Sequence, residues 1–194
     1  MSETNHERHK RGKYSDPSPY PEVKVLSPNL NYAEILMDDY AGVVSEFTAI
    51  SQYLYHHFLF KQIDKELGEL LENVAITEML HMEILADTIK KLGGNPVIRG
   101  SNSTLHGNFW SGKYIYYGTN ICKQLKADIV AEYKAIAEYQ KHIYYIGDFH
   151  VQAILQRIIL DEKVHIRLFS QALQKFCGCQ YPPSQINQTE NTVR

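Results

Sequence analysis

Apolar residues recur three and four positions apart in four segments of the chain, which is the spacing of a helix face that packs against other helices. The segments span about residues 30–62, 64–92, 119–146 and 149–176. Gly93-Gly94-Asn95-Pro96 follows the second segment, and Gly147-Asp148 separates the third from the fourth. Both are typical helix stop signals. The pattern therefore predicts four helices and an all-α fold.

The connections between these segments predict how the helices are arranged. Short breaks join the first helix to the second and the third to the fourth, so each pair forms a helical hairpin. Residues 95–117 join the hairpins and have no sustained helical period. This long crossover between helices 2 and 3 predicts an up-down-down-up four-helix bundle. We expect the bundle over residues 30–176, with an extended N-terminal arm over residues 1–29 and a polar C-terminal tail over residues 177–194.

Each apolar stripe is interrupted by an acidic side chain near its middle. The first and third stripes carry a lone glutamate, and the second and fourth carry a Glu-x-x-His pair. The six residues are Glu46, Glu78, His81, Glu132, Glu162 and His165. Four buried carboxylates would destabilise the bundle unless positive charge lies among them. Because two divalent cations balance four glutamates and two neutral imidazoles, the sequence predicts a site for two metal ions.

The order of these residues repeats in the two hairpins. In each hairpin a lone glutamate is followed about 30 residues later by a Glu-x-x-His pair, whose spacing places both side chains on one side of a helix. A single pair carries little information, since Glu3 and His6 in the arm match it too. The repeat is the specific signal, and it indicates that each hairpin supplies half of the site.

This arrangement resembles the ferritin-like superfamily of di-metal carboxylate proteins, with bacterioferritins, rubrerythrins and manganese catalases as the nearest branches. The resemblance covers about residues 30–176 and implies a ferritin-like bundle. It implies that Glu46 and Glu132 are terminal or bridging ligands, and that each Glu-x-x-His pair supplies a bridging carboxylate and a terminal imidazole. It also implies a tyrosine beside the metals, at Tyr53, and an aspartate that orients a ligating histidine, at Asp161.

The expected activity follows from two adjacent metals, which can bind an oxygen–oxygen bond and transfer two electrons. We expect a non-haem oxidoreductase with two metal ions, acting on hydrogen peroxide or dioxygen, with iron favoured over manganese. The side chains expected to act in catalysis are Glu46, Glu132 and Tyr53. A manganese catalase is one alternative. That branch generally lacks a glutamate ligand on the fourth helix, so the presence of Glu162 argues against it. A ferroxidase or iron-storage protein is the other.

Two further pairs of side chains on the stripes have open interpretations. Tyr53 and Tyr139 are either core aromatics or neighbours of the metals. His56 and His142 lie two or three turns from the six residues, so we expect histidines satisfied by neighbouring groups or partly exposed, rather than further metal sites.

Composition narrows the partners and the location. A net charge of -2 gives no bulk attraction to nucleic acid, and no apolar run approaches the roughly 18 residues of a membrane span. We expect a cytoplasmic protein whose three cysteines, Cys122, Cys177 and Cys179, are free thiols. The lack of a rubredoxin-type Cys-x-x-Cys pair means that a reductant would have to come from a separate electron donor. The proline-rich arm is suited to wrapping a partner subunit, which predicts a homodimer or small homo-oligomer.

Overall fold

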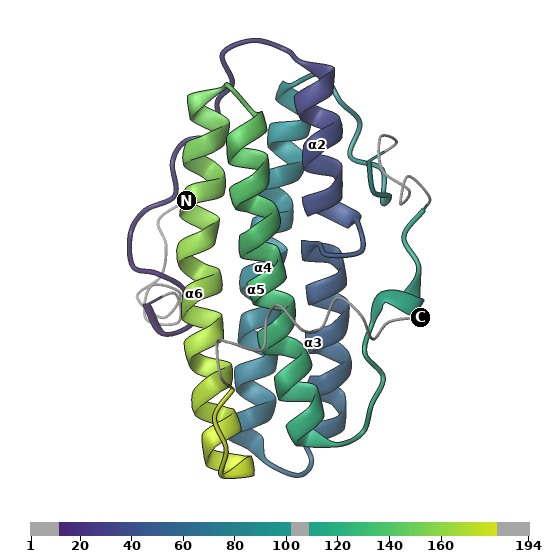
Figure 1. The fold of residues 1–194 in the computed structure, drawn as a ribbon, viewed down its shortest axis with the longest axis vertical. Coiled ribbons are helices and arrows are strands. Elements are labelled where there is room, and N and C mark those ends of the chain that lie inside the picture. The colour runs from purple at the N-terminus through teal and green to yellow at the C-terminus, as the bar shows by residue number, and fades with distance from the viewer. Residues whose placement is uncertain (1–11, 102–108, 182–194) are drawn as a thin grey trace.

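The computed structural model describes residues 12–101 and 109–181, and its helices align along one axis as a bundle (Figure 1). The long helices are α2 (Leu30–Ala41), α3 (Glu46–Phe60), α4 (Lys65–Lys91), α5 (Ile121–Tyr145) and α6 (Phe149–Cys177). The crossover contains a short 3-10 helix, η1 (Gly112–Tyr114). Together α2 and α3 occupy the place of the first predicted helix. The all-α ferritin-like bundle with a long crossover between its hairpins is confirmed.

Each long helix begins at a polar residue whose side chain accepts a hydrogen bond from a backbone N–H of the first turn. These N-cap residues are Asn29, Ser45, Asp64, Asn120 and Asp148. The last helix, α6, ends at Gly178, whose φ of 62° lies in the left-handed region that favours glycine. Local capping therefore explains why the observed ends of α4, α5 and α6 lie close to the predicted ones.

The first predicted helix is interrupted, whereas the apolar pattern predicted one continuous helix over about residues 30–62. A Cβ atom on Gly42 would lie 2.6 Å from the Asp38 carbonyl oxygen, so the chain turns where only glycine fits without a shift. The Gly42 carbonyl accepts hydrogen bonds from the hydroxyls of Ser45 and Thr48, at 2.9 and 3.0 Å. The interruption makes Glu46 the first residue of α3.

The apolar core is divided into two clusters along the bundle. One cluster lies at the α2 end and includes Leu36, Leu85, Leu155 and Ile158. The other lies at the α3 end and includes Leu67, Leu71, Ile129 and Phe169. Burial of each such side chain contributes about 1.5–3 kcal/mol to stability. The polar residues of the four stripes lie between these clusters, so apolar layers close the centre of the bundle at both ends.

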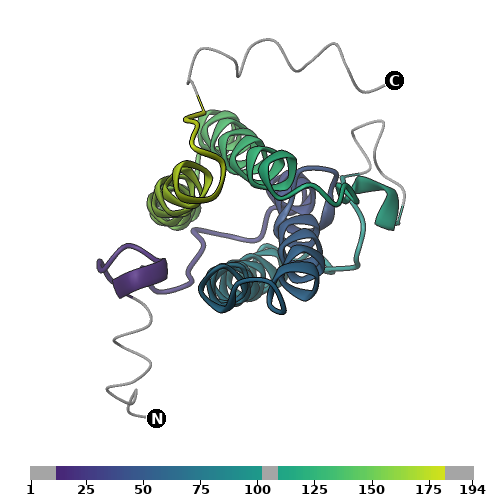
Figure 2. The ribbon, with the colours of Figure 1, turned by 90° about the horizontal axis from the view of Figure 1, so that it is seen from below.

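The described part of the N-terminal arm, residues 12–29, runs beside α6 and α4 of its own chain (Figure 2). The backbone N–H of Asp16 donates to Asp161 in α6 at 2.7 Å, and the N–H of Leu26 donates to Asp148 at 2.6 Å. Arg157 in α6 donates to the carbonyl oxygens of Ser18 and Asp16, both at 2.9 Å. These residues of the arm therefore contact their own bundle, and wrapping of a partner subunit by the arm stays a prediction.

A disulfide joins the start of α5 to the end of α6, which corrects the expectation of three free thiols. Cys122 and Cys177 are bonded with a Cα–Cα distance of 5.8 Å, and Cys179 is the free cysteine of the described residues. The bond closes a loop with a sequence separation of 55 residues, which is worth about 4 kcal/mol in the chain-entropy treatment. Sequence spacing could not reveal this pairing, because it depends on where two distant helix ends meet.

Among the described helices, none combines the length and the apolar character that crossing a membrane requires.

Candidate metal centre

All six residues predicted as metal ligands meet in the middle of the bundle. Their ligand atoms form two sets within which all atoms lie within 4.8 Å of one another. One set consists of Glu46, Glu78, His81 and Glu162, and the other consists of Glu78, Glu132, Glu162 and His165. The shared members are Glu78 and Glu162, one from each Glu-x-x-His pair. All six side chains are buried, with at most 3% of their surface exposed.

The histidines present the same ring nitrogen to the carboxylates. His81 Nδ1 lies 2.7 Å from Glu78 Oε2, and His165 Nδ1 lies 2.9 Å from Glu162 Oε2. The helix connects each pair, because residues three apart project to the same side. His165 Nδ1 also lies 2.8 Å from Glu78 Oε1, which belongs to the other hairpin. The two half-sites therefore interlock across the bundle.

Burial and mutual repulsion act on the acidic side chains. Burial, followed by repulsion from Glu78, raises the pKa of Glu46 well above its usual range. Burial and repulsion from Glu162 do the same to the pKa of Glu132. Burial opposes the charge of Glu78 as well, but the two histidines of the site hold the pKa of Glu78 below its usual range. Burial and repulsion thus favour the protonated forms of Glu46 and Glu132, whereas the histidines favour the charged form of Glu78.

Two buried oxygens indicate directly where further positive charge would fit. Glu78 Oε1 and Glu162 Oε1 are fully buried and have no hydrogen-bond partner within the described residues. His165 Nδ1 lies 2.8 Å from the first and His81 Nδ1 3.3 Å from the second, but neither contact has hydrogen-bond geometry. Buried carboxylate oxygens without a donor are costly in an apolar interior. Both belong to the two carboxylates shared by the ligand sets. The donor set of four carboxylates and two imidazoles therefore fits two divalent cations, and Glu78 and Glu162 would contribute to holding both.

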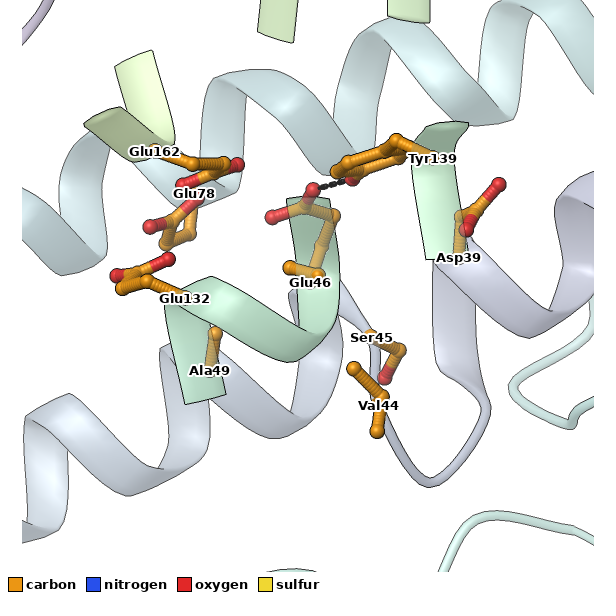
Figure 3. Close-up of a pocket in the computed structure, with 10 residues that line it drawn as sticks. Asp39, Val44, Ser45, Glu46, Ala49, Glu78, Glu132, Tyr139 and Glu162 are labelled. Atoms are coloured by element: carbon orange, nitrogen blue, oxygen red, sulfur yellow. Dashed lines mark hydrogen bonds between the residues drawn. The ribbon is translucent and has the colours of Figure 1, made fainter. Parts of the chain in front are cut away.

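Two tyrosines hold the glutamates that belong to one set only. Tyr53 donates to Glu132 Oε1 at 2.6 Å, and Tyr139 donates to Glu46 Oε1. Each tyrosine thus reaches the glutamate of the opposite hairpin (Figure 3 shows Tyr139 with Glu46). Both interpretations left open for these residues apply, because each ring is fully or almost fully buried and each hydroxyl contacts a candidate ligand.

His56 and His142 have carboxylate partners outside the six residues, as expected for satisfied histidines. His56 Nδ1 lies 3.0 Å from Asp128, and His142 Nδ1 lies 2.7 Å from Asp39. Sequence reasoning missed the two aspartates as partners. Both aspartates could have been noticed in the sequence. Asp39 lies on the apolar stripe of the first helix, with His56, and Asp128 lies on that of the third, with His142. The centre is thus flanked on each side by a buried histidine–aspartate pair.

The outer nitrogens of the two candidate ligand histidines are also occupied. His81 Nε2 lies 2.9 Å from Asp161 Oδ2, which matches the role that the resemblance implied for Asp161. His165 Nε2 lies 2.9 Å from the backbone carbonyl oxygen of Tyr14, in the arm. No sequence signal pointed to Tyr14, because its contribution comes from the backbone of a segment without periodicity.

A small pocket of about 20 Å³, room for about one water molecule, lies against the carboxylates on the side of the helix interruption (Figure 3). Its inner end is lined by Glu46, Glu78, Glu132 and Glu162. The rest of the wall is formed by Asp39, Val44, Ser45, Ala49, Ala135 and Tyr139. The pocket therefore has room only for a very small ligand beside the four carboxylates.

A four-helix bundle with two carboxylate and histidine ligand sets that share two glutamates defines the class of di-metal carboxylate bundles. The model of the ferritin-like domain family matches residues 42–177. The chain therefore belongs to the ferritin-like family.

Relatives in this family carry different functional names. A probable manganese catalase from Clostridium acetobutylicum is 29% identical over 171 residues, which are 79% of this chain and 75% of the relative. A bacterioferritin from Desulfovibrio desulfuricans is 28% identical over 127 residues, covering 64% of this chain and 65% of the relative. Among solved structures, the manganese catalase KatB from Anabaena PCC7120 superposes with a TM-score of 0.76, at 23% identity, over 88% of this chain and 83% of that chain. The chain is thus related to both manganese catalases and bacterioferritins.

Removal of a shared carboxylate is expected to disrupt both ligand sets. Glu78→Gln and Glu162→Gln should each lower the number of tightly bound ions from two per chain to one or none, because each replaced residue contributes to both sets. The measurement is elemental analysis after loading with Mn²⁺ or Fe²⁺ and dialysis. Glu83→Gln, the same change on the exposed face of α4, is the control and should leave two ions bound.

Two ions bound at normal strength by either Glu78→Gln or Glu162→Gln would show that the ligand assignment is wrong. Circular dichroism of the metal-free variants checks that the bundle has formed.

Proposed function

We propose that this chain binds two divalent metal ions in the centre of its bundle and processes hydrogen peroxide there. The observation that carries the proposal is the pair of ligand sets joined by Glu78 and Glu162. When bound, two adjacent ions would supply two one-electron changes, which matches cleavage of an oxygen–oxygen bond. The similarity to manganese catalases supports peroxide as the substrate.

The chain's own residues divide the work in this proposal. Glu78 and Glu162, which belong to both ligand sets, would hold both ions. Glu46 and Glu132 belong to one set each, so their carboxylates would be the ones able to move aside for a substrate without loss of the shared glutamates. Tyr53 restrains Glu132 through a 2.6 Å hydrogen bond, and Tyr139 restrains Glu46. We therefore propose Glu46, Glu132 and Tyr53 as catalytic residues.

The pocket supplies the route by which peroxide reaches the glutamates. Ala49 and Ala135 line it from α3 and α5, and each lies three residues after one of the lone glutamates. These small side chains leave the approach open, whereas apolar layers cover the centre along the bundle axis. Hydrogen peroxide and dioxygen are both small enough for this route, and larger organic substrates are disfavoured.

Different observations bear on which metal the centre binds and on which reaction it catalyses. The donor set accommodates either metal, and iron was favoured from the ligands alone. Similarity to manganese catalases supports manganese and dismutation, a reaction that needs no separate electron donor. The bacterioferritin similarity supports a second candidate, oxidation of Fe²⁺ with dioxygen or peroxide. We also propose a homodimer or small homo-oligomer as the functional form.

Oxygen release from hydrogen peroxide in the absence of a reductant is the direct test. Protein purified without metal and then loaded with Mn²⁺ should convert two molecules of peroxide into water and dioxygen, measured with an oxygen electrode. The metal-free protein, and Glu78→Gln treated in the same way, should release none. Peroxide consumption with Fe²⁺ oxidation and without oxygen release would favour the second candidate. If neither the Mn²⁺-loaded nor the Fe²⁺-loaded protein consumes peroxide, the proposal is refuted.

Filling the pocket should slow the reaction without removing the metals. Ala49→Leu is expected to lower kcat/KM for peroxide by about tenfold or more, a barrier increase of about 1.4 kcal/mol or more, because the added side chain obstructs the approach. Ala137→Leu, on the exposed side of α5, is the matched control. If Ala49→Leu binds two ions and reacts at the normal rate, the pocket is not the route.

A further inference from the structure

The N-terminal arm contacts the outer nitrogens of both candidate ligand histidines. The Tyr20 hydroxyl lies 3.1 Å from His81 Nε2 and donates to Asp161, the aspartate that also faces this nitrogen. Six residues earlier in the arm, the Tyr14 carbonyl oxygen lies 2.9 Å from His165 Nε2. The arm therefore reaches both halves of the site, although none of its residues belongs to either ligand set.

These contacts decide which nitrogen of each ring carries hydrogen. A backbone carbonyl oxygen only accepts hydrogen bonds, so His165 Nε2 must carry a hydrogen and donate it to Tyr14. With a neutral ring, Nδ1 then keeps its lone pair and faces Glu162 and Glu78. Asp161 accepts from His81 Nε2 in the same way. Fixing the outer nitrogen orients each ring for a cation on its inner side.

The arm is held in this position by a buried arginine. Arg157, only 6% exposed, donates to the carbonyl oxygens of Ser18 and Asp16, each at 2.9 Å. Its third contact is with Asp161 Oδ1 at 2.7 Å, and its guanidinium lies 4.0 Å from the centre of the Tyr20 ring. An arginine with this fork of donors fixes the direction of the chain as well as its position. The arm and the histidine environment thus form one connected network.

We propose that the N-terminal arm is a functional part of the metal centre, in which Tyr20 and the Tyr14 carbonyl are positioning groups that hold His81 and His165 in the ligating orientation. This inference rests on the proposed function, since it concerns the binding of the two ions. It assigns a role to a segment that carries no ligand, and it predicts that releasing the arm weakens metal binding while the bundle stays folded.

Release of the arm by Tyr20→Ala is the first test. The variant should bind Zn²⁺ and Co²⁺ about 10–100-fold more weakly than the unmodified chain, the usual cost of removing the groups that orient metal-ligating histidines. Affinity is measured by competition with a chelator. Tyr55→Ala removes a half-buried tyrosine whose hydroxyl contacts Tyr117, away from the six residues, and should bind both ions normally.

A spectroscopic readout separates positioning from general stability. In the zinc-loaded chain, ¹⁵N NMR should show hydrogen on Nε2 of His81 and His165 with slow exchange against solvent. In Tyr20→Ala these signals should broaden or exchange rapidly, and the Co²⁺ absorption spectrum should change. Tyr20→Phe keeps the ring over Arg157 but lacks the hydroxyl that contacts His81 and Asp161, so it should broaden the His81 signal and weaken binding while the His165 signal stays unchanged. Should Tyr20→Ala not fold, Arg157→Lys gives the same test, because lysine cannot bond both arm carbonyls and Asp161 in the same geometry.

The outcomes distinguish this inference from the proposed function. If the unmodified chain fails to bind two ions, the proposed function fails. If it binds two ions and the arm variants bind them with the same affinity and the same histidine signals, the arm is only a covering segment and the inference is wrong.

Discussion

Four glutamates buried together in the middle of a helical bundle are the constraint on which the rest of this structure depends. Each carboxylate lies among apolar layers, where an unpaired charge is costly. Two histidines and two tyrosine hydroxyls contact these carboxylates, and the pKa values of Glu46 and Glu132 are raised. Glu78 Oε1 and Glu162 Oε1 still have no hydrogen bond of suitable geometry within the described residues. Cations would satisfy these oxygens, so the stability and the proposed activity of the protein meet at the same atoms.

The two hairpins contribute similar contacts to the buried glutamates, but among the described residues only the first hairpin contains a helix interruption beside the site. Tyr53 contacts the lone glutamate of the second hairpin, and Tyr139 contacts that of the first. The interruption at Gly42, however, lies in the first hairpin, and the pocket opens beside it. A site built from two similar halves therefore has a distinct entrance, and the residues around it are small or polar. The break in the helix and the access to the centre are parts of one feature.

Much of the fold and of the candidate site could be predicted from the sequence, because both depend on helical periodicity. The stripes placed six distant residues on common faces, and the structure brings all six together. The interruption was not predicted, since Gly42 matters through its contact with Asp38 and not through the apolar pattern. The Cys122–Cys177 disulfide and the Tyr14 carbonyl contact were missed for a related reason. Both depend on tertiary positions that leave no periodic trace in the sequence.

The proposed centre requires two metal ions that share Glu78 and Glu162 as ligands. Anomalous X-ray diffraction from crystals of the chain loaded with manganese or iron, recorded at the absorption edge of the metal, tests it most directly. Two peaks about 3.5–4 Å apart are expected, one beside each histidine and both in contact with the shared glutamates. A single peak, or peaks away from these two carboxylates, would contradict it.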